Sequence, residues 1–476
     1  MATPFRDFVH DLHFADLPPE VVRYARRWLL DLIGIAAGGS TTDLSRIIRD
    51  HAAGHFGAGT RQAHMLFDGR AVSPAGAALT GGMTIDALDG HDGHKLTKGH
   101  VGCGSFPALL AFMQAEGQLS GEEFLTALVL GYEIGTRAGI ALHRTACDYH
   151  TSGAWIAVTC AALGARALGL DVARTREAIG IAEYHGPRSQ MMRCIDHPTM
   201  VKDGSGWGAM AGVSAAYLAV EGFTGAPAVT VEGEDVADLW GDLGQTWRIF
   251  EQYCKPYPVC RWAQPPLQAA LDLREAHGLT SDMIERIEVV TFHQSLRLAT
   301  RHPTTTEQAQ YSTAFPVAAA LVRGRLGPEE VNPSTFHDPE VLRLSEGMIV
   351  TEADEYNAAF PARRIAHVVL VLKDGRHLAS VPTEARGDPE APVTDAEVRE
   401  KFFGLTDSVC GRPRAEEIAT AVDSLGMGGG VDRLLGNVIE PVTPIEDVKA
   451  AAGKSASRPG AQGSSAPIRA ARASHP

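Results

Sequence analysis

The sequence predicts a mainly α-helical protein with a smaller α+β domain. Apolar segments rich in Ala and Gly recur at helical spacing up to about residue 265. Beyond that point, two segments rich in β-branched residues interrupt the helical pattern. The chain has 476 residues, more than one compact core usually holds, so two domains are expected.

Residues 1–265 are expected to form a large helical domain. The stretch 17–39 opens with two prolines, carries apolar residues at helical spacing and ends on Gly38 and Gly39, as helices prefer. Four further segments share this small-residue, apolar pattern: 105–117, 121–139, 154–170 and 206–222. Their alanines and glycines predict helices that pack closely.

Residues 266–395 are expected to form the smaller α+β domain. The strands are predicted within 284–293 and 363–383, and Asp374-Gly375 marks a hairpin inside the second. Helices of about 396–445 should return to the first domain. The final stretch, 450–476, is polar and rich in Gly, Ser and Pro, which predicts disorder.

The bulk composition limits the partners and the compartment. A net charge of −14 argues against nucleic acid or an anionic membrane surface as a partner. Seven cysteines without framework spacing suggest reduced thiols. The first residues lack a signal-peptide pattern, and no long uninterrupted apolar run suggests a spanning helix. We therefore expect a cytoplasmic protein that does not bind membranes.

The segment HDGHKLTKGH, residues 91–100, concentrates histidines and lysines in an acidic chain. A metal site, a pocket for an anionic substrate and a solvated loop are the three possible explanations. His91 and His94 have H-x-x-H spacing, but Lys95 and Lys98 would repel a divalent cation. No metal is therefore expected, and the pocket for an anion is preferred.

Known cofactor and nucleophile motifs are missing from the sequence. It contains no GxxxxGK[ST] loop, no strand-linked GxGxxG and no GxSxG elbow, so no cofactor is expected. Cationic and titratable groups instead recur ahead of helices rich in small residues, where a helix N-terminus favours an anion. These groups are Tyr149, His150, Lys202, Lys255, Tyr257 and Arg261.

Several ordered segments resemble the MmgE/PrpD family. DALDGHDGHKLTKGH, YHTSG, VKDGSGWGAMAGVSAAYLA, KPYPVCRWAQPPLQAAL and AQYSTAFPVAAAL are each similar to a family motif. The resemblance implies a large helical domain and a smaller α+β domain, with the active site in the cleft between them. It also implies a homodimer and no organic cofactor.

The resemblance places Asp89, His100, His150 and Lys202 on positions that matter in the family's motifs. This chain departs from the pattern at four positions. Gln264 stands where the pattern has a histidine, Phe315 replaces a tyrosine, Gly93 replaces a threonine and Tyr149 replaces a phenylalanine. These four departures argue against the simple dehydration of a citrate-like substrate.

The basic version of the 91–100 loop is most similar to the iminodisuccinate epimerase branch. The resemblance therefore implies a cofactor-independent epimerase of a polyanionic carboxylate, which removes an α-proton and returns one to the opposite face. Lys202 and Tyr149 are the expected acid/base pair, and His150 assists Tyr149. A tricarboxylate hydro-lyase or a cis-aconitate-like decarboxylase is the alternative, and an inactive carboxylate-binding homologue is another.

A substrate with several carboxylates needs cationic partners. Lys95, Lys98, His100 and Arg261 are expected to bind carboxylates, and Asp89 to orient His100 or a lysine. The role of His94 stays open between substrate contact and a cap on the loop. The complete predicted substrate-binding set is Asp89, His94, Lys95, Lys98, His100, Arg261 and Gln264.

Overall fold

The computed structural model describes residues 3–442, and helices dominate the first part of the chain. Before residue 250 the helices are α1 (Thr3–Asp11), α2 (Pro19–Gly39), α3 (Asp43–His55), α4 (Pro74–Asp86), α5 (Gly102–Glu116), α6 (Gly121–Thr145), α7 (Gly153–Ala167), α8 (Val172–His185), α9 (Met191–Asp196), α10 (Ser205–Val220) and α11 (Val229–Glu232). Short strands in this part are β1 (Ala63–His64), β2 (Ala71–Val72) and β3 (Gly93–His94).

The later part of the chain mixes strands and helices. Its strands are β4 (Gln252–Tyr253), β5 (Ile284–Thr291), β6 (Ile349–Glu352), β7 (Ile365–Leu372), β8 (His377–Ala379) and β9 (Thr383–Glu384). Its helices are α12 (Gln264–His277), α13 (His293–Leu296), α14 (Thr306–Gln310), α15 (Ala314–Arg323), α16 (Pro339–Glu346), α17 (Asp354–Ala359), α18 (Asp395–Cys410), α19 (Arg412–Ser424) and α20 (Asp432–Ile439).

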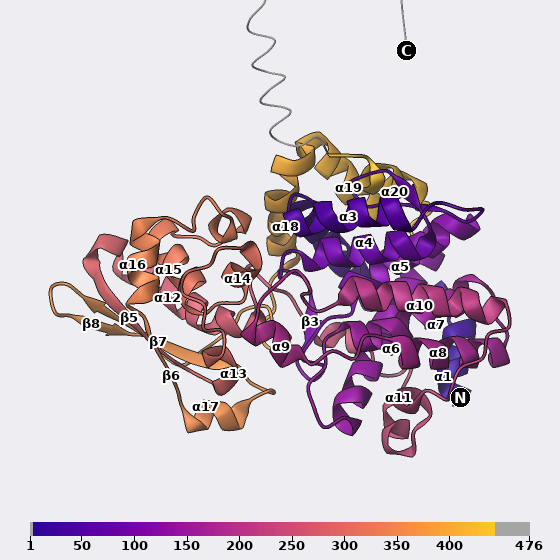
Figure 1. The fold of residues 1–476 in the computed structure, drawn as a ribbon, viewed down its shortest axis with the longest axis horizontal. Coiled ribbons are helices and arrows are strands. Elements are labelled where there is room, and N and C mark those ends of the chain that lie inside the picture. The colour runs from indigo at the N-terminus through magenta and orange to yellow at the C-terminus, as the bar shows by residue number, and fades with distance from the viewer. Residues whose placement is uncertain (1–2, 443–476) are drawn as a thin grey trace, which may run out of the picture. The chain divides into compact units, whose positions relative to one another are not determined.

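The helices rich in small residues pack against one another. Helix α10 contacts α4, α5, α7 and α8, and it runs beside α7 in Figure 1. Gly82 and Gly206 let the backbones of α4 and α10 touch, because a Cβ on Gly82 would lie 2.5 Å from the Cα of Gly206. This close crossing fixes the start of α10, which follows the predicted catalytic lysine.

Helix α6 passes through the middle of the helical part. It has the length and mean hydropathy, 1.2 over 18 residues, that a membrane-spanning helix needs, but every residue of that window is buried inside the fold. Arg137 and Glu133 on this helix form a fully buried ion pair of 2.6 Å. Helix α6 is therefore a core helix, and its apolar side chains are buried against neighbouring helices.

The α+β part is built on a five-stranded sheet. The strand order is β6-β5-β7-β8, and β9 also pairs with β7. Strands β5 and β6 are parallel, whereas β7 pairs antiparallel with β5 in a register that sets Val289 opposite Val368. Helices α12, α15 and α16 lie together beside the sheet (Figure 1), and α12 contacts β7. The predicted strands and the predicted fold class are confirmed.

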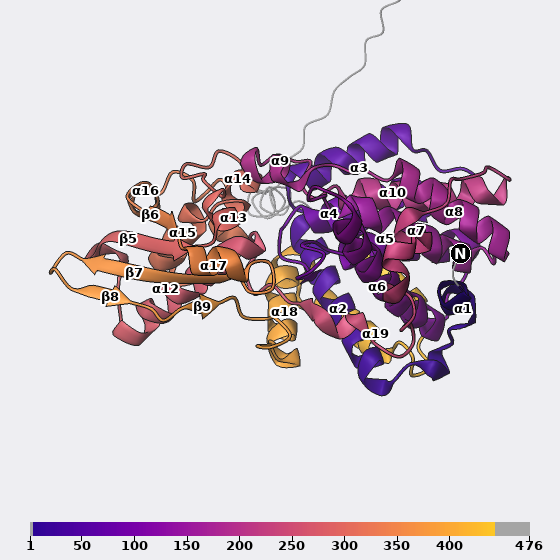
Figure 2. The ribbon, with the colours of Figure 1, turned by 90° about the horizontal axis from the view of Figure 1, so that it is seen from below.

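Helices α18 and α2 lie side by side although more than 350 residues separate them (Figure 2). Lys401 on α18 donates to the buried carboxylate of Asp31 on α2 at 2.7 Å and to the carbonyl oxygen of Gly90 at 2.6 Å. The last helices thus support the segment that carries Asp89. The predicted tail, 450–476, lies outside the described residues.

Candidate active site

Five segments meet around Asp89, and a two-residue ladder holds two of them together. Strand β3 pairs antiparallel with β4, which sets Gly93 opposite Tyr253 and His94 opposite Gln252. The other three segments are the end of α4, the loop before α10 and the short helix α14. Their side chains come from both the helical and the α+β parts of the chain.

Asp89 and Lys255 form a buried ion pair at the centre of the site. Asp89 is 3% exposed and Lys255 is fully buried, and the lysine Nζ also donates to the Asp89 carbonyl oxygen at 3.2 Å. Burial raises the pKa of Asp89, but the positive charges of Lys255 and Lys202 outweigh burial and hold it well below its usual value. Asp89 is therefore ionised and held by Lys255, and Lys202 adds a second positive charge nearby.

Lys202 has an unusual backbone conformation, and the side-chain amide of Gln310 binds its ammonium group. Its φ is +46°, a left-handed conformation that is rare outside glycine, and the side chain is 1% exposed. Its Nζ donates to Gln310 Oε1 at 2.7 Å and lies 4.6 Å from the centre of the Tyr311 ring. The same amide oxygen accepts from the backbone N–H of Asp89 at 2.8 Å, so Gln310 links both predicted residues.

His100 supplies a neutral imidazole to the same group. Burial, followed by the positive charge of Lys255, lowers the pKa of His100 well below its usual value. Its Nδ1 donates to the carbonyl oxygen of Asp92, so the proton resides on Nδ1. The unprotonated Nε2 lies 3.9 Å from Asp89 Oδ1 and 3.7 Å from Asp203 Oδ2.

Asp203 adds a second carboxyl group whose protonation changes near neutral pH. The residue is 2% exposed and accepts a hydrogen bond of 2.6 Å from Ser152. Burial, together with the negative charge of Asp86, raises the pKa of Asp203 to about 7. The site therefore holds one carboxylate, Asp89, and one readily protonated carboxyl group, Asp203.

Replacing Asp203 with asparagine should change how stability depends on pH. The unfolded carboxyl group loses its proton near 3.8, whereas the folded group keeps it to about 7. Between those values the unfolded state binds fewer protons, so the free energy of unfolding should fall with rising pH by up to about 1.4 kcal/mol per unit. Urea denaturation at about pH 5 and pH 8 should show this loss in the wild type and a smaller loss in Asp203→Asn. Equal losses in both proteins would contradict the prediction.

Asp89, His91 and His100 could also hold a metal ion, because their ligand atoms lie within 4.8 Å of one another. The Lys255 ammonium already contacts Asp89, and Lys202 adds a second positive charge nearby. A divalent cation there would have to displace Lys255 and tolerate Lys202. The lysines thus supply the positive charge that such an ion would bring.

Tyr149, Lys98 and His150 form a second group. The Tyr149 hydroxyl donates to the carbonyl oxygen of Lys98, and the Lys98 Nζ lies 4.6 Å from the centre of the Tyr149 ring. Burial, together with Asp203, raises the pKa of Tyr149 well above its usual value. His150 is 8% exposed and its Nε2 lies 3.4 Å from Asp148. Among the described residues, no hydrogen bond or ring contact joins Tyr149 to Lys202.

Lys95, Arg261 and Gln264 form a third group around Asp388. Arg261 donates to Asp388 at 2.6 Å, and Lys95 lies 3.4 Å from the same carboxylate. The Gln264 amide accepts from Arg261 at 3.1 Å and donates to two backbone carbonyl oxygens. The carboxylate partners of Lys95 and Arg261 are therefore protein residues in this structure, and Gln264 is fully engaged.

His94 contacts Glu251 and the loop. Its Nε2 lies 2.8 Å from Glu251 Oε2, and its Nδ1 accepts from the backbone N–H of Thr97 at 3.4 Å. The side chain is 2% exposed. Of the two roles considered for His94, substrate contact and a cap on the loop, this geometry favours the cap.

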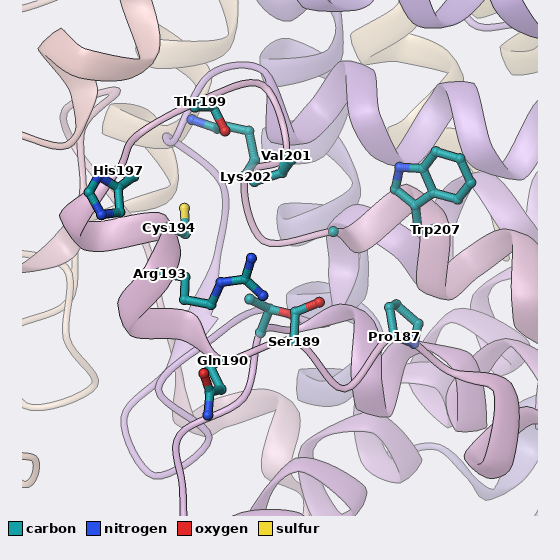
Figure 3. Close-up of a pocket in the computed structure, with 12 residues that line it drawn as sticks. Pro187, Ser189, Gln190, Arg193, Cys194, His197, Thr199, Val201, Lys202 and Trp207 are labelled. Carbon is teal, nitrogen blue, oxygen red and sulfur yellow. The ribbon is translucent and has the colours of Figure 1, made fainter.

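A cavity of about 410 Å³ opens beside Lys202 (Figure 3). Lys202 lies on the loop before α10, and Arg193 projects from the short helix α9 on the facing side. Its wall also includes Thr151, Pro187, Ser189, Gln190, Cys194, His197, Thr199, Val201, Gly204 and Trp207. The cavity is large enough for a small polycarboxylate and gives it access to the buried lysine.

The sequence indicated Lys255 only as one of several cations ahead of helices, and it gave no role to three other side chains that the structure brings to the site: Asp203, Gln310 and Tyr253. Lys255 and Gln310 lie in motifs that carry the family resemblance, KPYPVCRW and AQYSTAF, and Asp203 directly follows Lys202. Those motifs were the available signal. Tyr253 had none, because its position depends on the two-residue pairing of β3 with β4.

Two departures from the family pattern have a steric explanation. A Cβ on Gly93 would lie 2.5 Å from the Tyr253 hydroxyl oxygen, so this chain's tyrosine excludes a side chain at residue 93. Phe315 is fully buried, with its ring centre 5.7 Å from that of Phe336. It therefore packs in the core of the α+β part.

The fold and this site define a two-domain family. The MmgE/PrpD N-terminal domain matches residues 4–240, and the MmgE/PrpD C-terminal domain matches residues 257–426. The chain belongs to the MmgE/PrpD family.

Three relatives show how far the similarity extends. The chain is 24% identical to a cis-aconitate decarboxylase-like protein of Aspergillus oryzae, over 90% of this chain and 95% of the relative. It is 22% identical to the cis-aconitate decarboxylase of Mus musculus, over 88% and 90%, and 23% identical to that of Homo sapiens, over 88% and 91%. These relatives favour the decarboxylase alternative over the epimerase that the basic loop suggested.

Proposed function

We propose that the protein is a lyase that decarboxylates a tricarboxylate of the cis-aconitate type. The observation that carries the proposal is the convergence of two buried lysines, Lys202 and Lys255, on Asp89. Loss of CO₂ leaves negative charge on carbon, and preorganised cations in a buried site stabilise that charge. The names of the three relatives support the same reaction class.

The reaction needs one proton donor. The carboxylate on the saturated carbon of cis-aconitate leaves as CO₂, and its bonding electron pair becomes a new C=C bond. The electrons of the old double bond move to its far carbon, which takes one proton. Lys202 lines the cavity and carries N–H groups, so we assign it the donor's role. Lys255 holds Asp89 ionised, and solvent returns the proton to Lys202.

Epimerisation would need two acid/base groups on opposite faces of one carbon. Tyr149, the expected partner of Lys202, donates its hydroxyl proton to the Lys98 carbonyl, and its pKa is raised by burial. The pair of Lys202 and Tyr149 therefore gives little support to epimerisation. A hydro-lyase is the second candidate, because the unprotonated Nε2 of His100 is available as a base for an α-proton.

Proton NMR with cis-aconitate in deuterated water tests the proposal. We expect a new pair of =CH₂ signals, release of CO₂, and one deuterium in the product at the carbon that is protonated. Hydration of the double bond without loss of CO₂ would identify the hydro-lyase. Conversion of iminodisuccinate into its other diastereomer, with no turnover of cis-aconitate, would identify the epimerase.

Replacing Tyr149 with phenylalanine separates the lyase from the epimerase through one hydroxyl group. In the lyase this hydroxyl group only anchors the Lys98 backbone, so kcat should fall by no more than about tenfold. An epimerase that uses the phenol as an acid or a base should lose about a hundredfold or more. The measurement is kcat for CO₂ release, and a hundredfold loss would move Tyr149 into the chemistry.

A further inference from the structure

We propose that Arg364, Lys98 and Tyr253 form a second anion subsite, which binds one carboxylate arm of the substrate. The inference rests on the proposed function only in taking the ligand to be a tricarboxylate. It is carried by three hydrogen-bond donors that share one neighbourhood and lack acceptors. Arg364 and Lys98 lie outside the Asp89 group, which already has its counter-charges, and Tyr253 borders it, with its ring centre 6.4 Å from that of His100.

Arg364 is a buried arginine whose donors are mostly unused. The residue is 2% exposed, and its Nε and Nη1 have no hydrogen-bond partner among the described residues. Its Nη2 makes one long bond of 3.4 Å, to the carbonyl oxygen of Lys95. A buried guanidinium with unpaired N–H groups is costly, and a bound anion would supply the acceptors that these groups lack.

Lys98 adds an ammonium group without a carboxylate partner. Within residues 3–442, its Nζ has no hydrogen bond or ion pair, and it rests 4.6 Å from the centre of the Tyr149 ring. Burial, together with the positive charge of Arg364, lowers the pKa of Lys98. That repulsion places the two cations within electrostatic reach of one another, and an anion between them would relieve it.

Tyr253 provides the third donor. The residue is 2% exposed, and in the described part of the chain its hydroxyl group has no hydrogen-bond partner. The guanidinium of Arg364 lies 5.3 Å from the centre of its ring and that of Arg261 lies 4.6 Å from it. Gly93 leaves the hydroxyl group its space, because a Cβ there would lie 2.5 Å from the oxygen.

The local charges leave room for an anion. Asp388 is neutralised by Arg261 at 2.6 Å and by Lys95 at 3.4 Å, and Lys95 also pairs with Glu390 at 2.8 Å. These two cations and two carboxylates balance one another. Arg364 also helps to lower the pKa of Asp388, so four cations, with Lys98, accompany two carboxylates here, and one or two further carboxylates would offset the difference.

The buried guanidinium of Arg364 lies against the 91–100 loop, where its Nη2 donates to the carbonyl oxygen of Lys95. On the same loop, Lys98 is half-buried and has a left-handed backbone, with φ +52°. The subsite binds the central carboxylate of the substrate, which does not react, while Lys202 contacts the reacting carbons.

Binding of two inert ligands tests the subsite without turnover. Tricarballylate has three carboxylates, and glutarate is the same molecule without the central one. Titration calorimetry should show that the wild type prefers tricarballylate, and that Arg364→Met loses about 10- to 100-fold of that preference. The matched control is Arg363→Met, because Arg363 is exposed and pairs with Glu384 at 2.6 Å, and it should bind as the wild type does.

Two further variants keep the test decisive if Arg364→Met does not fold. Tyr253→Phe and Lys98→Met should each reduce the preference for tricarballylate and leave the melting temperature near that of the wild type. Tyr257→Phe, which removes a hydroxyl group bonded to Gln268 at 3.0 Å, is the control for Tyr253→Phe. An unchanged preference in Tyr253→Phe and Lys98→Met, or a wild type that does not distinguish the two ligands, would overturn the proposal. A preserved preference in an enzyme that fails to decarboxylate would reject the proposed function alone.

Discussion

Replacing Lys202 with methionine is expected to lower kcat for CO₂ release by at least about a hundredfold. The variant removes the proton donor and one of the two cations near Asp89, and both are needed when charge develops on carbon. Methionine has a similar length and the same backbone strain at φ +46°, so the loop should keep its conformation. Gln310 also retains its bond from the backbone N–H of Asp89 at 2.8 Å, which preserves the wall of the site.

The control for this variant is Lys373→Met, which removes an exposed lysine in the turn after β7. We expect unchanged kcat there and an unchanged melting temperature in both variants. Stopped-flow or calorimetric assay of CO₂ release gives the rates. Near-normal turnover in Lys202→Met would remove Lys202 from the chemistry and leave Lys255 as the cation to examine.

Replacing Lys255 with methionine should destabilise the protein by about 3–5 kcal/mol, because it leaves the buried Asp89 carboxylate without its closest counter-charge. Asp89→Asn should also destabilise, since it leaves a fully buried ammonium group unpaired. The double variant removes both charges at once and should regain much of the loss. Urea unfolding of the three variants and the wild type measures the four free energies.

Additive losses in the double variant would contradict this prediction, because they would mean that the pair does not interact. All three variants should lose catalysis, since each removes at least one charge of the Asp89–Lys255 pair from the site. The coupling between the two substitutions therefore reports on the ion pair separately from activity.

The larger helices and strands were predictable because their buried apolar residues recur in the sequence or form long β-branched runs. The apolar spacing within 17–39 matches α2, and the β-branched runs match β5 and β7. Strands β3 and β4 could not be predicted, because two-residue strands have no period. Each of these two strands is defined only by its pairing with the other, in which Gly93 lies opposite Tyr253.

The site residues that lie in family motifs were predictable from the sequence. Asp89, His100 and Lys202 were named from their motifs, and the structure brings them together around Lys255. The roles of Lys255 and Arg364 depend on contacts across more than 150 residues, which a local pattern does not encode. Arg363 and Arg364 are neighbours in the sequence, yet one is exposed and the other is buried. Only the fold separates them.

The packing of α18 against α2 has a consequence for biosynthesis. Helix α2 is made within the first 39 residues, but Lys401, the counter-charge of its buried Asp31, is made about 370 residues later. A ribosome that adds about 5–20 residues per second needs tens of seconds to bridge that gap. During this time the part of α2 that packs against α18 is uncovered and Asp31 lacks its counter-charge, which makes the nascent chain more prone to aggregate until α18 emerges.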